Sequence, residues 1–195
     1  MILLARLISY ISNPLVLIFP APFFIVYRTT PNAMYALEWT VFSWLFLFII
    51  AVFVMYAVLR GIFTDFDVSR REQRPLLFFF TSVIALLYLL GLFALHGPKV
   101  LFVAILGVLL GIFCISLINT RLKASIHLAT ISAIISAISL LYGGLFLMLF
   151  ILIPIVAWAR VTVKRHTIQE AIIGGLTGSI LTIGLYIALV FVLRV

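Results

Sequence analysis

Long apolar runs separated by short polar stretches make up nearly the whole of this sequence. Runs of about twenty residues recur from end to end, the length that an α-helix needs to cross a bilayer. The pattern predicts an all-α, polytopic transmembrane helical bundle, with six core spans after a Pro-rich N-terminal membrane segment. We expect a single integral-membrane domain over residues 1–195, with its core at about 36–195. The first four core spans are expected at about 36–59, 76–95, 100–118 and 127–141. The fifth core span ends near Trp158, and the sixth runs to about Leu193.

The first apolar segment, from about Leu7 to Tyr27, differs from the others because it carries Pro14, Pro20 and Pro22. Proline removes a backbone donor and kinks or breaks a helix. The segment therefore predicts a kinked spanning helix or a re-entrant one. It has no clear small-residue cleavage site, so we interpret it as a retained membrane segment and not as a signal peptide.

The composition agrees with a membrane protein and excludes several other classes. The chain is 66% hydrophobic and 9% charged, whereas a soluble domain has roughly a quarter of charged residues. The net charge of +8 lies in short loops without a basic face, which argues against nucleic acid and fits contact with anionic membrane lipids or a phosphorylated substrate. The single Cys114, inside an apolar run, predicts a core residue and excludes a disulfide within the chain.

Three polar stretches interrupt the apolar pattern, at residues 60–75, 119–125 and 160–170. Two predicted spans separate each stretch from the next. An even number of crossings places all three on the same side of the membrane. Most ionisable groups therefore converge on one face, a distribution that is typical of a site.

The third stretch, Arg160 to Glu170, holds the richest chemistry. If it continues as the start of the last helix, His166 and Glu170 are four residues apart and share one face. A carboxylate at one imidazole nitrogen leaves the other nitrogen free as a nucleophile or base. Arg160 supplies a fork suited to phosphate. The residues predict phosphoryl-group chemistry at a membrane surface; the alternative is a basic boundary loop that only orients a helix.

These stretches resemble the three motifs of the type 2 phosphatidic acid phosphatase superfamily, which comprises integral-membrane lipid phosphatases and soluble relatives. The third family motif has Arg, five residues, His, three residues and Asp. Arg160, His166 and Glu170 keep that spacing, with Glu in place of Asp. The second motif, usually Ser-Gly-His, reads Ser-Ile-His at residues 125–127.

The first family motif, usually Lys, six residues and Arg-Pro, is the least similar. Arg74 and Pro75 match it, but the Lys position falls on Asp67. Arg70 or Arg71 would then substitute for the lysine from one turn away. The resemblance covers roughly residue 60 to the C-terminus.

The resemblance implies a lipid phosphatase that acts through a phosphohistidine and needs no metal and no cofactor. His166 would attack phosphorus, Glu170 would orient it, and His127 would protonate the leaving alkoxide. Its implied partners are a lipid phosphate substrate, either phospholipid or polyprenyl, and the surrounding membrane lipids. The implied phosphate ligands are Arg74, Arg160 and Ser125, with Arg71 and Lys123 as further candidates that also fit as membrane-surface charges.

Two other functions stay open from the sequence. One is a non-catalytic lipid-binding or transport bundle on a degenerate phosphatase scaffold. The other is a metal-dependent intramembrane prenyltransferase, which the pair Asp65 and Asp67 faintly resembles. Such enzymes need two acidic clusters around a diphosphate, and the only other carboxylates, Glu38, Glu72 and Glu170, form no second cluster in the sequence.

The side of the membrane that the site faces is predicted from positive charge, which normally stays cytoplasmic in short loops. The family's usual arrangement implies the outer side. Here seven cations on the site's face, with Arg74 and Arg160 set aside as phosphate ligands, outnumber three on the other. We therefore expect a cytoplasmic site in a multi-pass protein of a prokaryotic cell membrane. The seven are Arg60, Arg70, Arg71, Arg121, Lys123, Lys164 and Arg165, and the three are Arg28, Lys99 and Arg194.

Overall fold

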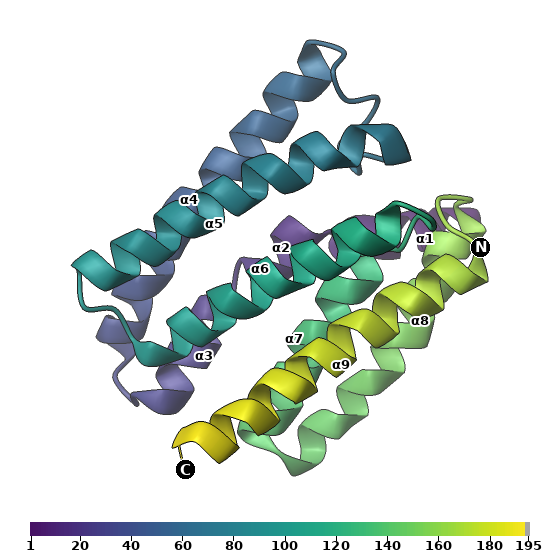
Figure 1. Ribbon diagram of the computed structural model, residues 1–195. Helices are drawn as coiled ribbons and strands as arrows, with labels where there is room; N and C mark the ends of the chain where they lie inside the picture. Colours follow the sequence, from purple (N-terminus) through teal and green to yellow (C-terminus); the bar gives the residue numbers. More distant parts are fainter. Residues whose placement is uncertain (194–195) are drawn as a thin grey trace. The chain divides into compact units, whose positions relative to one another are not determined.

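The computed structural model describes residues 1–193, with side chains described through residue 188. Arg194, which entered the count of loop charges, lies outside these residues. Every regular element among residues 1–193 is helical, so the all-α prediction is confirmed. In chain order the elements are α1 Ile2–Ile11, α2 Pro14–Ile18, α3 Ala21–Thr29, α4 Ala33–Leu59, η1 Arg71–Gln73, α5 Arg74–Ala94, α6 Lys99–Asn119, α7 Ile126–Tyr142, η2 Gly144–Ile151, α8 Leu152–Thr162 and α9 Ile168–Leu193 (Figure 1).

Several of these helices are long and apolar enough to cross a membrane, which makes the chain a multi-pass membrane protein. Within residues 1–193, five helices are long and apolar enough to span a membrane, and up to six are if the bent N-terminal pair counts as one span. Helix α7, the span predicted at about 127–141, has 17 residues. At 1.5 Å per residue it is about 26 Å long, somewhat less than the roughly 30 Å hydrocarbon core. The five are Ala33–Leu59, Arg71–Ala94, Lys99–Asn119, Gly144–Thr162 and Ile168–Ala188.

The Pro-rich N-terminal segment is broken, as the prolines predict. Helix α1 ends at Ile11 and α2 begins at Pro14, whose missing N–H is not needed in a first turn. The Asn13 side chain between them accepts a hydrogen bond from the Leu15 N–H at 3.0 Å. The two parts, Ile2–Ile11 and Pro14–Thr29, meet at a bend of 47°.

The chain divides into two compact units, one of which is the continuous segment Phe19–Asn119. In this unit α3 to α6 pack around a core at whose centre Tyr88 and Ser43 share a buried hydrogen bond of 2.8 Å. The prediction of one domain over residues 1–195 stays a prediction. The core residues are Val26, Ala36, Trp39, Tyr88, Leu92 and Leu101.

The other unit joins Met1–Ile18 to the chain from Thr120 onward, and it carries two of the three predicted motifs. Its central contact is between α7 and α9. A side chain on Gly174 would meet the Ser125 carbonyl, and one on Gly178 would meet the Ala129 carbonyl. Both pairs step by four residues in the same direction, so α7 and α9 run parallel with their backbones in close approach (Figure 1). Their N-terminal ends therefore meet.

Candidate functional site

The turn after α8 sets the spacing between Arg160 and His166. Lys164 adopts a left-handed conformation, with φ of 57°, and its N–H donates to the Val161 carbonyl at 2.9 Å. The carbonyl of Arg160 accepts from the N–H of Arg165 at 3.1 Å and from that of His166 at 3.3 Å. This is the Schellman ending of a helix. It reverses the chain so that His166 follows directly on the buried end of α8.

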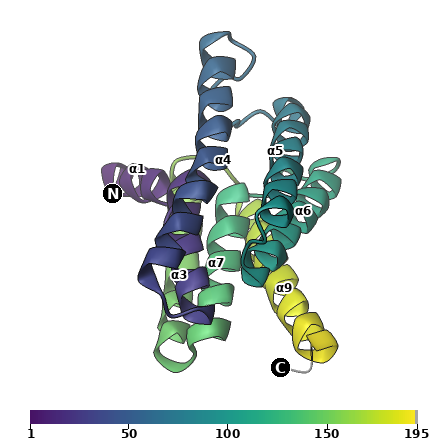
Figure 2. The ribbon, with the colours of Figure 1, turned by 90° about the vertical axis from the view of Figure 1, so that its left-hand side faces the viewer.

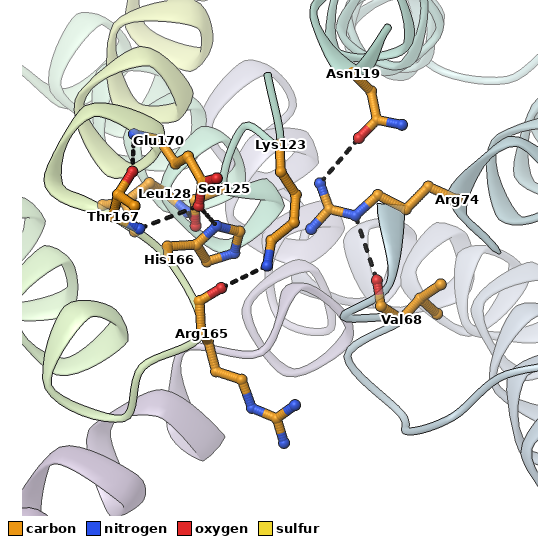
Figure 3. A network of polar contacts seen from close by, with 10 residues as sticks. All are labelled: Val68, Arg74, Asn119, Lys123, Ser125, Leu128, Arg165, His166, Thr167 and Glu170. Atoms are coloured by element: carbon orange, nitrogen blue, oxygen red, sulfur yellow. Dashed lines mark hydrogen bonds and ion pairs between the residues drawn. The ribbon is translucent and has the colours of Figure 1, made fainter. Parts of the chain in front are cut away.

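Glu170 binds His166 from the first turn of α9. One carboxylate oxygen, Oε2, lies 3.0 Å from His166 Nδ1 and accepts the Thr167 N–H at 3.1 Å. In return the Glu170 N–H donates to Thr167 Oγ1 at 3.2 Å. Thr167 and Glu170 thus form a capping box. His166 lies before α9 and not within it, so the reach of this cap, and not the pitch of a helix, brings the two side chains together (Figure 3).

The carboxylate selects one tautomer of His166. Because an ionised carboxylate can only accept, Oε2 favours the proton on Nδ1, and the neutral ring then has its lone pair at Nε2. The side chain of His166 is 2% exposed and that of Glu170 is 16% exposed, so the pair is largely shielded from solvent. An imidazole held this way can act as a nucleophile or base through Nε2.

The start of α7 supplies the second motif to the same end of this unit. Ser125 caps the helix, with its Oγ accepting from the Leu128 N–H at 3.4 Å. Its own N–H donates to the carbonyl of Glu170 at 3.1 Å. His127, in the first turn and buried, places Nε2 at 3.4 Å from Nη1 of Arg160. The structure therefore brings together Ser125, His127, Arg160, His166 and Glu170.

Lys123 ties the two loops of this end together. Its Nζ donates to the carbonyl of Arg165 at 2.7 Å, one residue before His166 (Figure 3). The hydrogen bond gives Lys123 a part in holding the His166 turn. Its predicted role as a phosphate ligand stays a prediction.

Arg74, from the first predicted motif, lies in the other unit. It opens α5 directly before Pro75 and is 2% exposed. Its Nε donates to the Val68 carbonyl at 3.3 Å and its Nη1 to Asn119 Oδ1 at 3.4 Å (Figure 3). Asn119 in turn donates to the backbone carbonyl of Arg71 at 3.3 Å. The roles predicted for Arg74 and Arg71 in binding phosphate stay predictions.

Asp65 organises the loop before α5. Asp65 Oδ1 accepts from the Asp67 N–H at 3.0 Å, and from the N–H and hydroxyl of Ser69 at 3.3 and 3.0 Å. A carboxylate so used organises a turn. Over residues 1–193, no three His, Cys, Asp or Glu side chains gather in a way that could hold a metal ion.

Three residues of these networks were not predicted from the sequence. Thr167 carries a readable signal, because Thr-x-x-Glu at residues 167–170 is the capping-box pattern. Asn119 closes α6 and contacts Arg74, but a single Asn at a helix end has no specific meaning. Ser9 contacts Arg160 from the N-terminal helix, and nothing near it in the sequence indicates this.

The chain matches no family model, no curated protein and no solved structure.

Proposed function

We propose that this protein is a membrane lipid phosphatase that cleaves a phosphate monoester or diphosphate through a phosphohistidine, without a metal ion. One observation carries the proposal: His166 Nδ1 lies 3.0 Å from Glu170, beside a buried Arg160 and a second histidine, His127. A nucleophile, its orienting carboxylate, an anion ligand and a general acid are the groups that such a reaction needs. The motif resemblance assigns the same roles.

In the first step Nε2 of His166 attacks phosphorus. A P–N bond forms and the bond from phosphorus to the leaving oxygen breaks, which is the lipid oxygen of a monoester or the bridging oxygen of a diphosphate. His127 in its protonated form gives its proton to that leaving oxygen. The phosphorylated ring of His166 is cationic while Nδ1 keeps its proton, and the Glu170 carboxylate at 3.0 Å stabilises that charge.

In the second step a water molecule replaces the histidine. His127, now neutral, takes a proton from the water as its oxygen attacks phosphorus and the P–N bond breaks. Inorganic phosphate leaves and both histidines return to their starting states. Two histidines serve because one is occupied by the phosphoryl group while the other moves the proton.

Phosphate oxygens would be held by Arg160 and by the N-terminal end of α7. Arg160 is 1% exposed, and guanidinium groups stabilise the charge that develops on phosphoryl oxygens. The cap residue Ser125 is fully buried at the start of α7, and helix N-termini favour anions. The phosphate would thus bind among groups from α7, α8 and α9.

Turnover in detergent separates this proposal from its alternatives. Purified protein is incubated with phosphatidic acid or with a polyprenyl diphosphate, with and without EDTA, and free phosphate is measured. We expect release that resists EDTA. Release that EDTA abolishes would favour metal-dependent chemistry, and no turnover of either substrate would favour a non-catalytic lipid-binding bundle.

The side of the membrane that the site faces is a separate prediction. Thr120, exposed in the loop before α7, can be replaced by cysteine in a Cys114→Ser background. We expect this cysteine to react with a membrane-impermeant thiol reagent only after lysis, because the surplus of loop cations favours the cytoplasm. Labelling of intact cells would show that the site lies on the outer side; the Cys114→Ser protein without Thr120→Cys is the matched blank.

A further inference from the structure

Ser9 makes a short side-chain contact with Arg160. Nη1 of Arg160 donates to Ser9 Oγ at 2.6 Å, across 151 residues of sequence. Hydrogen bonds from a charged donor are shorter and stronger than neutral ones. Ser9 lies outside the region of the motif resemblance, in a helix that the sequence marks only as a Pro-rich membrane segment.

Packing on both sides of Ser9 fixes its position. Helix α1 packs on α8; Ala5 within α1 and Ser12, its C-cap residue, are buried. Ile8 and Leu17, before and after Ser9, lie against the apolar core of α7, α8 and α9. Figure 2 shows α1 running crosswise to α7. Ser9 is therefore presented to Arg160 by a helix that is anchored to the site's own unit.

The contact constrains how Arg160 can point. Nη1 carries two hydrogens; one is directed to Ser9 Oγ at 2.6 Å and the other faces Nε2 of His127 at 3.4 Å. The hydroxyl thus constrains the rotation of the guanidinium plane. When a phosphate binds, the second N–H can donate to a phosphate oxygen instead of to Nε2 of His127. Nε2 of His127 would then be available for proton transfer.

We propose that Ser9 is a positioning residue of the phosphate site, acting through Arg160, so that the N-terminal helix is a working part of that site. The inference rests on the proposed function, because it concerns how Arg160 is presented to a phosphoryl group. It adds to the three motifs a residue that no motif contains.

The test compares Ser9→Ala with Ser9→Thr, which keeps the hydroxyl, and with Ser12→Ala as the matched control. Ser12 is the buried C-cap residue of α1, and its hydroxyl donates to the Ser9 carbonyl at 3.3 Å and not to Arg160. Affinity for orthovanadate, a mimic of the transferring phosphoryl group, is measured together with kcat and KM for a lipid phosphate. Ser9→Cys is a second variant in case Ser9→Ala does not fold, and thermal unfolding in detergent checks every protein.

We expect Ser9→Ala to weaken orthovanadate binding about tenfold and to lower kcat/KM about as much. Ser9→Thr and Ser12→Ala should stay within about twofold of wild type. In an Arg160→Ala background the Ser9→Ala change should have no further effect, because a residue that acts through Arg160 has nothing left to position.

Two results would overturn the inference and leave the proposed function standing. The first is that Ser9→Ala binds orthovanadate as tightly as an active wild type. The second is that Ser9→Ala weakens orthovanadate binding by the same factor in the Arg160→Ala background as in the wild type. A wild-type protein that neither binds orthovanadate nor releases phosphate would overturn the proposed function, and the inference with it.

Discussion

Replacing His166 with alanine is expected to abolish the release of phosphate from a lipid phosphate while the helical bundle stays folded. In the proposed reaction Nε2 of His166 forms the bond to phosphorus, so the substitution removes the covalent step. Loss of a covalent nucleophile costs about 10⁴-fold or more in kcat. Phosphate release in detergent measures the rate, and circular dichroism verifies the helices.

Three companion variants distinguish the roles of the residues around His166. Glu170→Gln should cost less than His166→Ala, since Glu170 orients the ring and does not attack. His127→Ala should lower the rate by about 10² to 10⁴-fold, as loss of a general acid does. Thr167→Ala removes the cap hydroxyl at 3.2 Å from the Glu170 N–H and leaves the carboxylate. It should lower stability by about 1 kcal/mol with little change in rate.

A His166→Ala protein that still releases phosphate would remove the phosphohistidine mechanism. If Thr167→Ala lowered the rate as much as Glu170→Gln, Glu170 would act mainly as a cap for α9. The pH dependence of kcat adds a readout that a cap would not move. It should report two coupled histidines and not one group alone.

The helices could be predicted from the sequence because apolar run length is a strong signal in a membrane protein. Where the ends differ, local hydrogen bonds decide them. The span predicted at about 36–59 begins earlier in the structure, where α4 starts at Ala33. The Asn32 side chain accepts the Tyr35 N–H at 3.1 Å and caps the helix there. The span predicted at about 127–141 agrees with the bounds of α7 within one residue at each end, and Ser125 caps α7 as Asn32 caps α4.

The candidate site could be predicted only where its residues are close in the sequence. The pairing of His166 with Glu170 is confirmed at 3.0 Å, although its cause is the capping box and not a shared helical face. The contact from Ser9 to Arg160 could not be predicted, because it depends on how α1 packs against α8 after the whole unit has folded. Periodicity reports which face of a helix is apolar and does not report which distant helix will cover it.

The close approach of α7 and α9 carries the prediction with the largest expected effect on stability. A Cβ on Gly178 would collide with the backbone carbonyl of Ala129, and a backbone group cannot move aside as a flexible side chain can. Gly178→Ala must therefore push the helices apart. Overpacking of this kind costs about 1–3 kcal/mol, and it would also strain the hydrogen bond from Ser125 N–H to the Glu170 carbonyl, 3.1 Å long, which joins the two motifs.

Gly184 is the matched control because it lies in the same helix, and a Cβ built there meets nothing within 4 Å. Alanine is favoured over glycine by about 0.5–1 kcal/mol in a helix interior, so Gly184→Ala should raise the midpoint of thermal unfolding in detergent. Gly178→Ala should lower it by several degrees and reduce phosphate release in parallel. The two substitutions change the same atoms in the same helix, and only their surroundings differ. If both substitutions raised the midpoint of thermal unfolding, α7 and α9 would not approach as closely as in the structure. The close contact that joins the second and third motifs would then be contradicted.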